Sequence, residues 1–101
     1  MEKVSLNELK RKGLLRLPNG FGGSNLMDME TGWNRIFLKS TSLENKNTAL
    51  RLHCSTAKGS EVSASIRSDD KSLLSKIRVV LEQQMIGKSI SEIYSESLII
   101  L

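Results

Sequence analysis

Residues 69–86 read DDKSLLSKIRVVLEQQMI, the longest stretch of the chain with a regular apolar period. Its apolar residues recur at steps of three and four, which is typical of one buried face on a helix of about five turns. Ser68 and Asp69 are suited to the N-terminus of a helix, and Gly87 is suited to its end. We therefore predict a long main helix over residues 69–86. Its buried face would consist of Leu73, Leu74, Ile77, Val80, Leu81 and Met85.

Before this helix the apolar period changes to two. Three segments alternate, at residues 33–39, 48–55 and 61–67, and short polar stretches connect them. Strands joined by short connections typically form an antiparallel meander with one apolar face. The sequence therefore predicts a two-layer α+β fold, in which an antiparallel sheet of three to four strands is covered on one face by the main helix. The meander would occupy residues 33–67, and residues 14–17 could supply the fourth strand.

Both ends of the chain carry the signature of a short helix. Residues 5–8 and 89–92 have the S-x-x-E spacing of a capping box, in which side chains accept hydrogen bonds from backbone N–H groups at the helix start. These motifs predict a short N-terminal helix within residues 1–13 and a C-terminal helix within residues 90–101. Residues 97–101 are suited either to the end of that helix or to a short strand at the edge of the sheet.

The composition is that of a small globular domain. With 101 residues, 39% of them hydrophobic, residues 1–101 have enough apolar side chains for one core and a single domain. One cysteine excludes an internal disulfide, and no apolar run has the length of a signal sequence or a membrane span. We therefore expect a cytoplasmic protein that does not contact a membrane. The net charge of +4 permits an acidic partner but does not require one.

The sequence carries no familiar catalytic or cofactor-binding motif. His53 and Cys54 are its only His and Cys, and adjacent residues of a strand point to opposite faces, so they are not placed to act as a catalytic pair. The glycine-rich loop at residues 19–25 matches neither of the common phosphate-binding motifs. We predict a non-catalytic protein without a metal or cofactor. The alternative is a small enzyme with carboxylate chemistry, and its candidate residues are Asp28, Glu30 and Glu61.

One face of the predicted sheet gathers side chains that are suited to binding. If Ile36 and Leu38 point into the core, the opposite face carries two aromatic and several basic residues. The candidate residues on this face are Trp33, Arg35, Phe37, Lys39, Arg51, His53 and Arg67. Rings and cations on an open sheet are typical of protein-binding hot spots and of platforms for single-stranded nucleic acid. In the alternative interpretation, Trp33 and Phe37 lie on the buried face of the first strand.

Three further features are candidates for contact with a partner. They are a basic cluster near the end of the first helix, an aromatic residue in the glycine-rich loop and an apolar tail that is suited to docking on the core or to forming a homo-oligomer. The basic cluster consists of Lys10, Arg11 and Lys12, the aromatic residue is Phe21, and the apolar tail consists of Leu98, Ile99, Ile100 and Leu101. We therefore predict a small binding protein, an adaptor, regulator or inhibitor that acts on a larger protein or protein assembly. The alternative is a nucleic-acid-binding module that uses the basic and aromatic sheet face.

Overall fold

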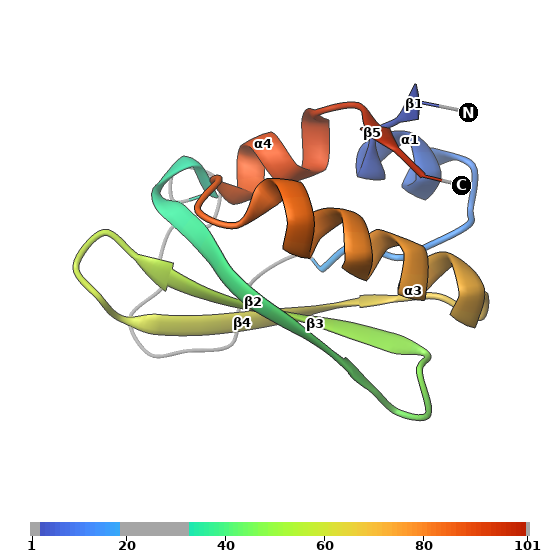
Figure 1. The fold of residues 1–101 in the computed structure, drawn as a ribbon, viewed down its shortest axis with the longest axis horizontal. Helices are drawn as coiled ribbons and strands as arrows, with labels where there is room; N and C mark the ends of the chain where they lie inside the picture. Colours follow the sequence, from blue (N-terminus) through green and yellow to red (C-terminus); the bar gives the residue numbers. More distant parts are fainter. Residues whose placement is uncertain (1–2, 19–32, 101) are drawn as a thin grey trace.

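The protein has an α+β fold built on a three-stranded antiparallel sheet (Figure 1). The structure is a computed structural model and describes residues 3–18 and 33–100. The strands β2, β3 and β4 lie in that order in the sheet. They comprise Ile36–Glu44, Ala49–Thr56 and Glu61–Arg67. The predicted antiparallel meander is therefore confirmed, although its first strand begins three residues later than expected.

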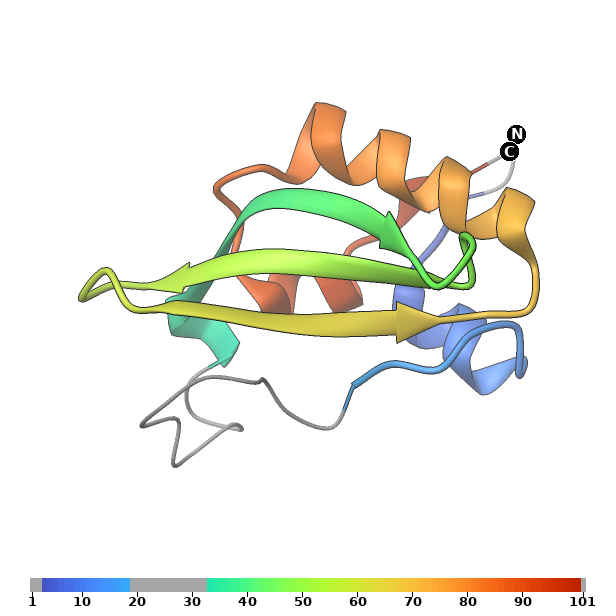
Figure 2. The ribbon, with the colours of Figure 1, turned by 90° about the horizontal axis from the view of Figure 1, so that it is seen from below.

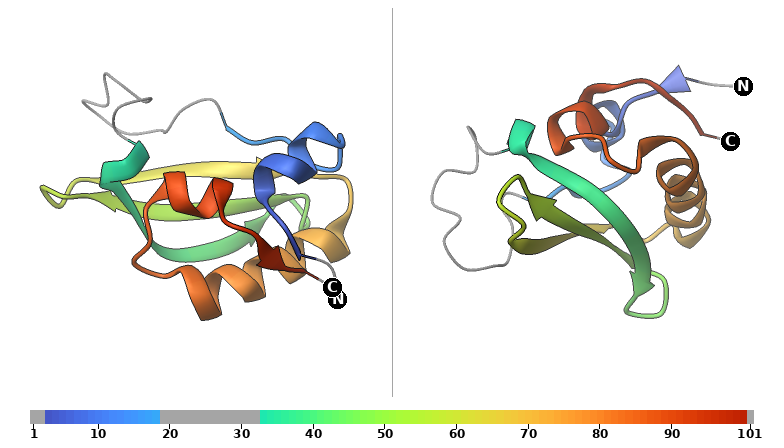
Figure 3. Two further views of the ribbon diagram at one scale, coloured as in Figure 1. Left: turned by 90° about the horizontal axis from the view of Figure 1, so that it is seen from above. Right: turned by 60° about the vertical axis from the view of Figure 1, so that its left-hand side comes forward.

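The helices lie together on one side of this sheet. They are α1 (Leu6–Arg11), α3 (Lys71–Val80) and α4 (Ile90–Ser95). Figure 1 shows all three above the strands. Seen from above, α4 lies in front of the strands (Figure 3, left), and seen from below the strands lie in front of α4 (Figure 2). The side of the sheet that faces away from these helices is called the outer face below. The main helix thus shares the inner side of the sheet with α1 and α4 and does not cover it alone.

The main helix is shorter than the sequence predicts. It begins at Lys71 because Asp70 is the N-cap, with its carboxylate accepting a hydrogen bond of 3.0 Å from the Leu73 N–H. After ten α-helical residues it continues for five more as a π-helical turn, η2 (Leu81–Met85). Gly87, with a φ of +87°, then adopts the left-handed conformation that ends the helix. The predicted apolar stripe is confirmed from Leu74 to Met85, where its members are buried, whereas Leu73 is only partly buried.

The first strand differs from its prediction at both ends. Trp33–Arg35 form a short 3₁₀-helix, η1, and β2 continues through a polar run to Glu44. A β-bulge between Leu38 and Ser40 shifts the alternation, so Ile36 and Leu38 point into the core, as does Thr41 beyond the bulge. The strand continues beyond its apolar segment because its backbone remains paired with β3 as far as Ala49.

The two ends of the chain pair with each other in a second small sheet. β1 (Lys3–Val4) is antiparallel to β5 (Leu98–Ile99), so the strand predicted within residues 97–101 exists but does not join the edge of the main sheet. The capping box at the start of α4 is confirmed, because Ser89 and Glu92 exchange both hydrogen bonds. Residues 14–17 do not form a fourth strand, since only Arg16 among them pairs with the sheet.

The core lies between the inner side of the sheet and the helices. Its largest fully buried side chains come from every layer: Leu6, Ile36, Leu38, Leu50, Leu52, Ile66, Leu74, Ile77, Leu81, Met85, Ile90 and Ile93. Leu98 and Ile100 are buried with them, which anchors the end of the chain. Among residues 3–18 and 33–100, none of the helices combines the length and the apolar character that crossing a membrane requires.

Candidate binding face of the sheet

Serine side chains border two larger polar residues on the outer face. The register of the strands places Ser40 and Ser63 on either side of His53. One row further along, Ser42 and Ser65 lie on either side of Arg51 in the same way. Because serine is short, the two longer side chains of the central strand are not hidden by their cross-strand neighbours.

Three hydrogen bonds hold these longer side chains across the strands. The Arg51 guanidinium donates from Nε to the Glu44 carboxylate at 2.8 Å and from Nη1 to the Ser63 hydroxyl at 2.9 Å. The His53 Nε2 lies 2.8 Å from the Ser42 hydroxyl. The ion pair with Glu44 balances the charge of Arg51. Arg51 and His53 therefore each have a hydrogen-bond partner on a neighbouring strand, which gives both side chains a defined orientation on the outer face.

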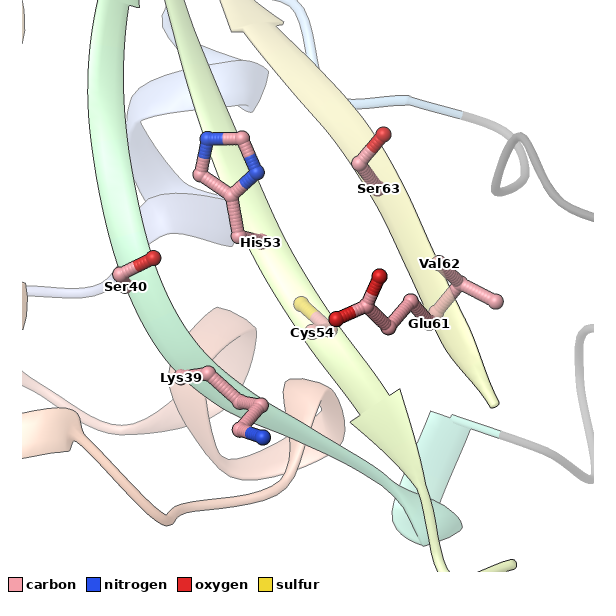
Figure 4. A pocket seen from close by; sticks show the side chains of 7 residues that line it. All are labelled: Lys39, Ser40, His53, Cys54, Glu61, Val62 and Ser63. Atoms are coloured by element: carbon pink, nitrogen blue, oxygen red, sulfur yellow. The ribbon is translucent and has the colours of Figure 1, made fainter. Parts of the chain in front are cut away.

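A hollow of about 460 Å³ lies on this face beside the β-bulge (Figure 4). Its lining residues are Lys39, Ser40, His53, Cys54, Glu61, Val62 and Ser63. Lys39 extends from β2 and the Glu61 carboxylate from β4, so the hollow has a positive and a negative group on its two sides (Figure 4). An open, polar hollow of this kind is suited to a side chain that protrudes from a partner, since small-molecule sites are mostly enclosed and apolar.

The groups that this site presents are hydrogen-bonding and charged side chains. The pair of Ser42 and His53 has the spacing of a nucleophile and its base, but no described residue is bonded to the second ring nitrogen to orient the imidazole. Cys54 is buried, and burial raises the pKa of its thiol to about 12, so the thiol stays protonated near neutral pH. No group of three or more metal-ligating residues comes together within the described parts of the chain.

The structure brings five of the seven residues predicted for this face onto the sheet. Phe37, Lys39, Arg51, His53 and Arg67 belong to its three strands and alternate with core residues. Phe37 is half-buried, and Arg67 lies at the end of β4, where it exchanges two backbone hydrogen bonds with Arg16. The assumption that Ile36 and Leu38 point inward is therefore correct.

The placement of Trp33 and Arg35 in a strand is wrong. Both lie in the 3₁₀-helix that precedes β2, and Arg35 is exposed there. Trp33 packs against the core, with its ring 5.5 Å from that of Tyr94 in an edge-to-face arrangement. The prediction assumed that the alternation of residues 36–39 also holds for residues 33–35. In the structure residues 33–35 contact α4 and lie toward the helices. The outer face thus lacks its predicted Trp.

The other candidates lie away from the outer face or outside the described residues. Lys10, Arg11 and Lys12 are exposed at the end of α1, on the side of the helices. Leu98 and Ile100 are buried in the protein's own core, which leaves Ile99 as the exposed part of the described tail. The predictions for Phe21, Asp28, Glu30 and Leu101 concern positions outside the residues that the structure describes.

Sequence reasoning missed the residues that organise the site. Ser40, Ser42 and Glu44 belong to a polar run that was assigned mostly to a connection between strands. Their role depends on the bulge and on the partners they meet on β3, and neither leaves a periodic signal in the sequence.

Comparison with known proteins does not add to this description. No protein-family model matches the chain, and no curated protein or solved structure matches it significantly.

Proposed function

We propose that this is a small non-catalytic binding protein that recognises a partner protein through the outer face of its sheet. The observation that carries this proposal is the ordered layer of Arg51, His53 and their hydrogen-bond partners beside an open hollow. An adaptor, a regulator or an inhibitor would need this kind of preformed surface. The buried free thiol of Cys54 supports a cytoplasmic place of action.

Preorganisation is the physical reason that this face favours binding. A side chain that is already fixed loses little conformational entropy when a partner arrives. Arginine held in this way is also a frequent hot spot in protein interfaces. The short serines let a partner's backbone approach closely enough to use the remaining donors and acceptors of the face, and Lys39 and Glu61 offer one charge of each sign.

A protein partner is favoured over nucleic acid for two reasons. Binding of single strands depends on aromatic rings on which bases stack, and Trp33 packs beside α4 instead of lying on the outer face. The carboxylates of Glu44 and Glu61 also lie among the cations of this face and would repel phosphates. Hydrogen-bonding groups of mixed charge are better matched to the surface of another protein.

The test compares two serine-to-arginine variants on opposite sides of the molecule. Ser65→Arg places a bulky side chain beside Arg51 on the outer face, and Ser75→Arg places it on the exposed side of α3. A partner captured from the source cells by the wild-type protein is purified, and its affinity for each variant is measured by calorimetry. We expect Ser65→Arg to weaken binding by roughly tenfold or more, as for a blocked interface centre, and Ser75→Arg to leave it unchanged.

Circular dichroism melts establish that both variants fold. Equal affinity of the partner for the wild-type protein and for Ser65→Arg would contradict the proposal, as would the failure of the wild-type protein to retain any partner.

A further inference from the structure

A second concavity is lined by residues of α1, of the start of α3 and of β1, together with Ile100, which follows β5. These elements lie together on the side of the helices (Figure 3, left). The concavity has a volume of about 210 Å³, and we call it the α1–α3 groove. Buried Val4, Leu9 and Ile100 line it together with the more exposed Leu14 and Leu73. The groove is therefore mainly apolar. It shares no lining residue with the hollow on the outer face.

Leu14 is held at the groove although 47% of its surface is exposed. Gly13, with a φ of +76°, ends α1 in the left-handed conformation, and the Leu14 N–H then donates to the Leu9 carbonyl at 3.0 Å. The Leu14 carbonyl accepts a hydrogen bond of 2.7 Å from the Ser68 hydroxyl. Because the backbone of Leu14 is held on both sides, its partly exposed side chain is kept at the edge of the groove.

The charges around the groove are mainly positive. Lys12 and Lys76 line it, and Lys10 and Arg11 are exposed on the same end of α1. Asp70 also lines the groove and keeps its negative charge while its carboxylate accepts the hydrogen bond that caps α3, so one acid lies among these cations. An occupant with an apolar side chain and nearby carboxylates would match this arrangement, because its negative groups would meet the lysines.

We propose that the α1–α3 groove binds an acidic linear peptide of a partner protein. One aliphatic side chain of the peptide sits between Leu14 and Leu73, and flanking Asp or Glu residues contact Lys76 and the exposed Lys10 and Arg11 at the end of α1. The groove is smaller than the usual volume of small-molecule sites, about 300 to 1,000 Å³, which favours a single anchoring side chain. This site is separate from the outer face and does not depend on the function proposed for that face.

Selection from a random 12-residue peptide library, displayed on phage and offered to the immobilised full chain, tests the proposal. We expect the enriched peptides to share an aliphatic residue flanked by acidic residues. One of them, synthesised with a fluorescent label, is then titrated with variants while its anisotropy is followed. Failure to enrich this pattern would overturn the proposal.

Two matched pairs of variants locate the binding. Leu14→Asp should weaken binding of the labelled peptide roughly tenfold or more. Ile86→Asp changes a similarly exposed aliphatic residue on another part of the surface and should leave the affinity unchanged. Lys76→Glu should weaken it, whereas Lys58→Glu, with the same change of net charge on the turn between β3 and β4, should have less effect.

Further readouts keep the result interpretable. Leu14→Ala replaces Leu14→Asp if the acidic variant does not fold, and a smaller loss of affinity is then expected. Ser65→Arg, which tests the outer face, should bind the peptide as the wild-type protein does. Equal binding by the wild-type protein and the Leu14 variant, or an equal loss in both members of a pair, would overturn the proposal.

Discussion

Two side chains of β3, Arg51 and His53, take their orientation from residues on the neighbouring strands. Glu44 and Ser63 hold Arg51, and Ser42 holds His53. Their neighbour Cys54 points the other way into the core, where burial suppresses its ionisation. Consecutive residues of one strand thus contribute to a polar surface and to an inert interior, because alternate side chains leave opposite faces of a sheet.

The pKa of Cys54 predicts how stability depends on alkaline pH. The folded protein holds the thiol proton up to about pH 12, whereas an unfolded chain releases it near the ordinary value of 9.0. The stabilising contribution is therefore complete below pH 9 and is lost as the pH rises from 9 toward 12. We expect the free energy of unfolding, measured in urea, to fall less steeply above pH 9 in Cys54→Ala than in the wild-type protein.

Tyr94 is a second buried group that contributes to the fall of stability at alkaline pH. Burial, and secondarily the nearby Cys54 thiol, raise the pKa of its phenol, so the wild-type slope contains contributions from both groups. Tyr94→Phe should also flatten the slope, and at a higher pH than Cys54→Ala does. Identical slopes in the wild-type protein and Cys54→Ala would mean that the thiol is not protected by burial.

The β-bulge of β2 and the π-helical turn η2 are joined by one carboxylate. Glu82 Oε1 accepts hydrogen bonds from the Thr41 N–H at 3.1 Å and from its hydroxyl at 2.8 Å. Thr41 is buried because the bulge turns it inward, so its polar groups need a partner. The π-helical turn places Glu82 where it can supply that partner, and the two irregularities support each other.

Removal of this carboxylate should destabilise the protein. We expect Glu82→Ala to lower the free energy of unfolding by about 1 kcal/mol, which is below the usual range for hydrogen bonds to charged groups because Glu82 itself is exposed. Glu82→Gln, which keeps an acceptor, should lose less. Gln83→Ala, at the next exposed position, is the control and should change stability by less than about 0.5 kcal/mol. If Glu82→Ala is as stable as Gln83→Ala in urea, the bulge does not depend on this contact.

The molecule as a whole separates its polar sheet surface from its helices. α1, α3 and α4 cover the inner side, and the end strands β1 and β5 close that side at one end of the sheet (Figure 1). The basic cluster of α1 lies with the helices, so it does not extend the cations of the outer face. The positive charge of the protein is therefore distributed over separate surfaces.

This distribution predicts weak binding to nucleic acid. Labelled single-stranded and duplex oligonucleotides should bind the protein only at low salt. Cations that lie on separate surfaces neutralise few phosphates at once, so binding releases few counterions from the nucleic acid. Arg51→Ala should leave that weak binding unchanged because Glu44 already pairs with Arg51. Arg35→Ala removes an exposed cation and is the comparison. Micromolar binding that persists at moderate salt and falls in both variants would favour the nucleic-acid alternative over a protein partner.

The main elements and several helix ends could be predicted from the sequence. The apolar period of α3, the alternation of β3 and β4 and the caps Ser5 and Ser89 all appear where local patterns place them. The site was predicted only in part. Arg51 and His53 were found because they alternate with core residues, but their partners Ser42, Ser63 and Glu44 could not be assigned to them.

Helix periods, strand alternation, helix caps and glycine stops depend on residues a few positions apart and can be predicted from the sequence. Other features depend on contacts between distant residues and appear only in the folded chain. Thr41 and Glu82 are 41 residues apart, and Leu14 and Ser68 are 54 apart. Trp33 packs on Tyr94 and does not lie on the outer face, and β1 and β5 near the two ends of the chain pair with each other. Such contacts form only when the hydrophobic core is folded, so no local sequence pattern predicts them.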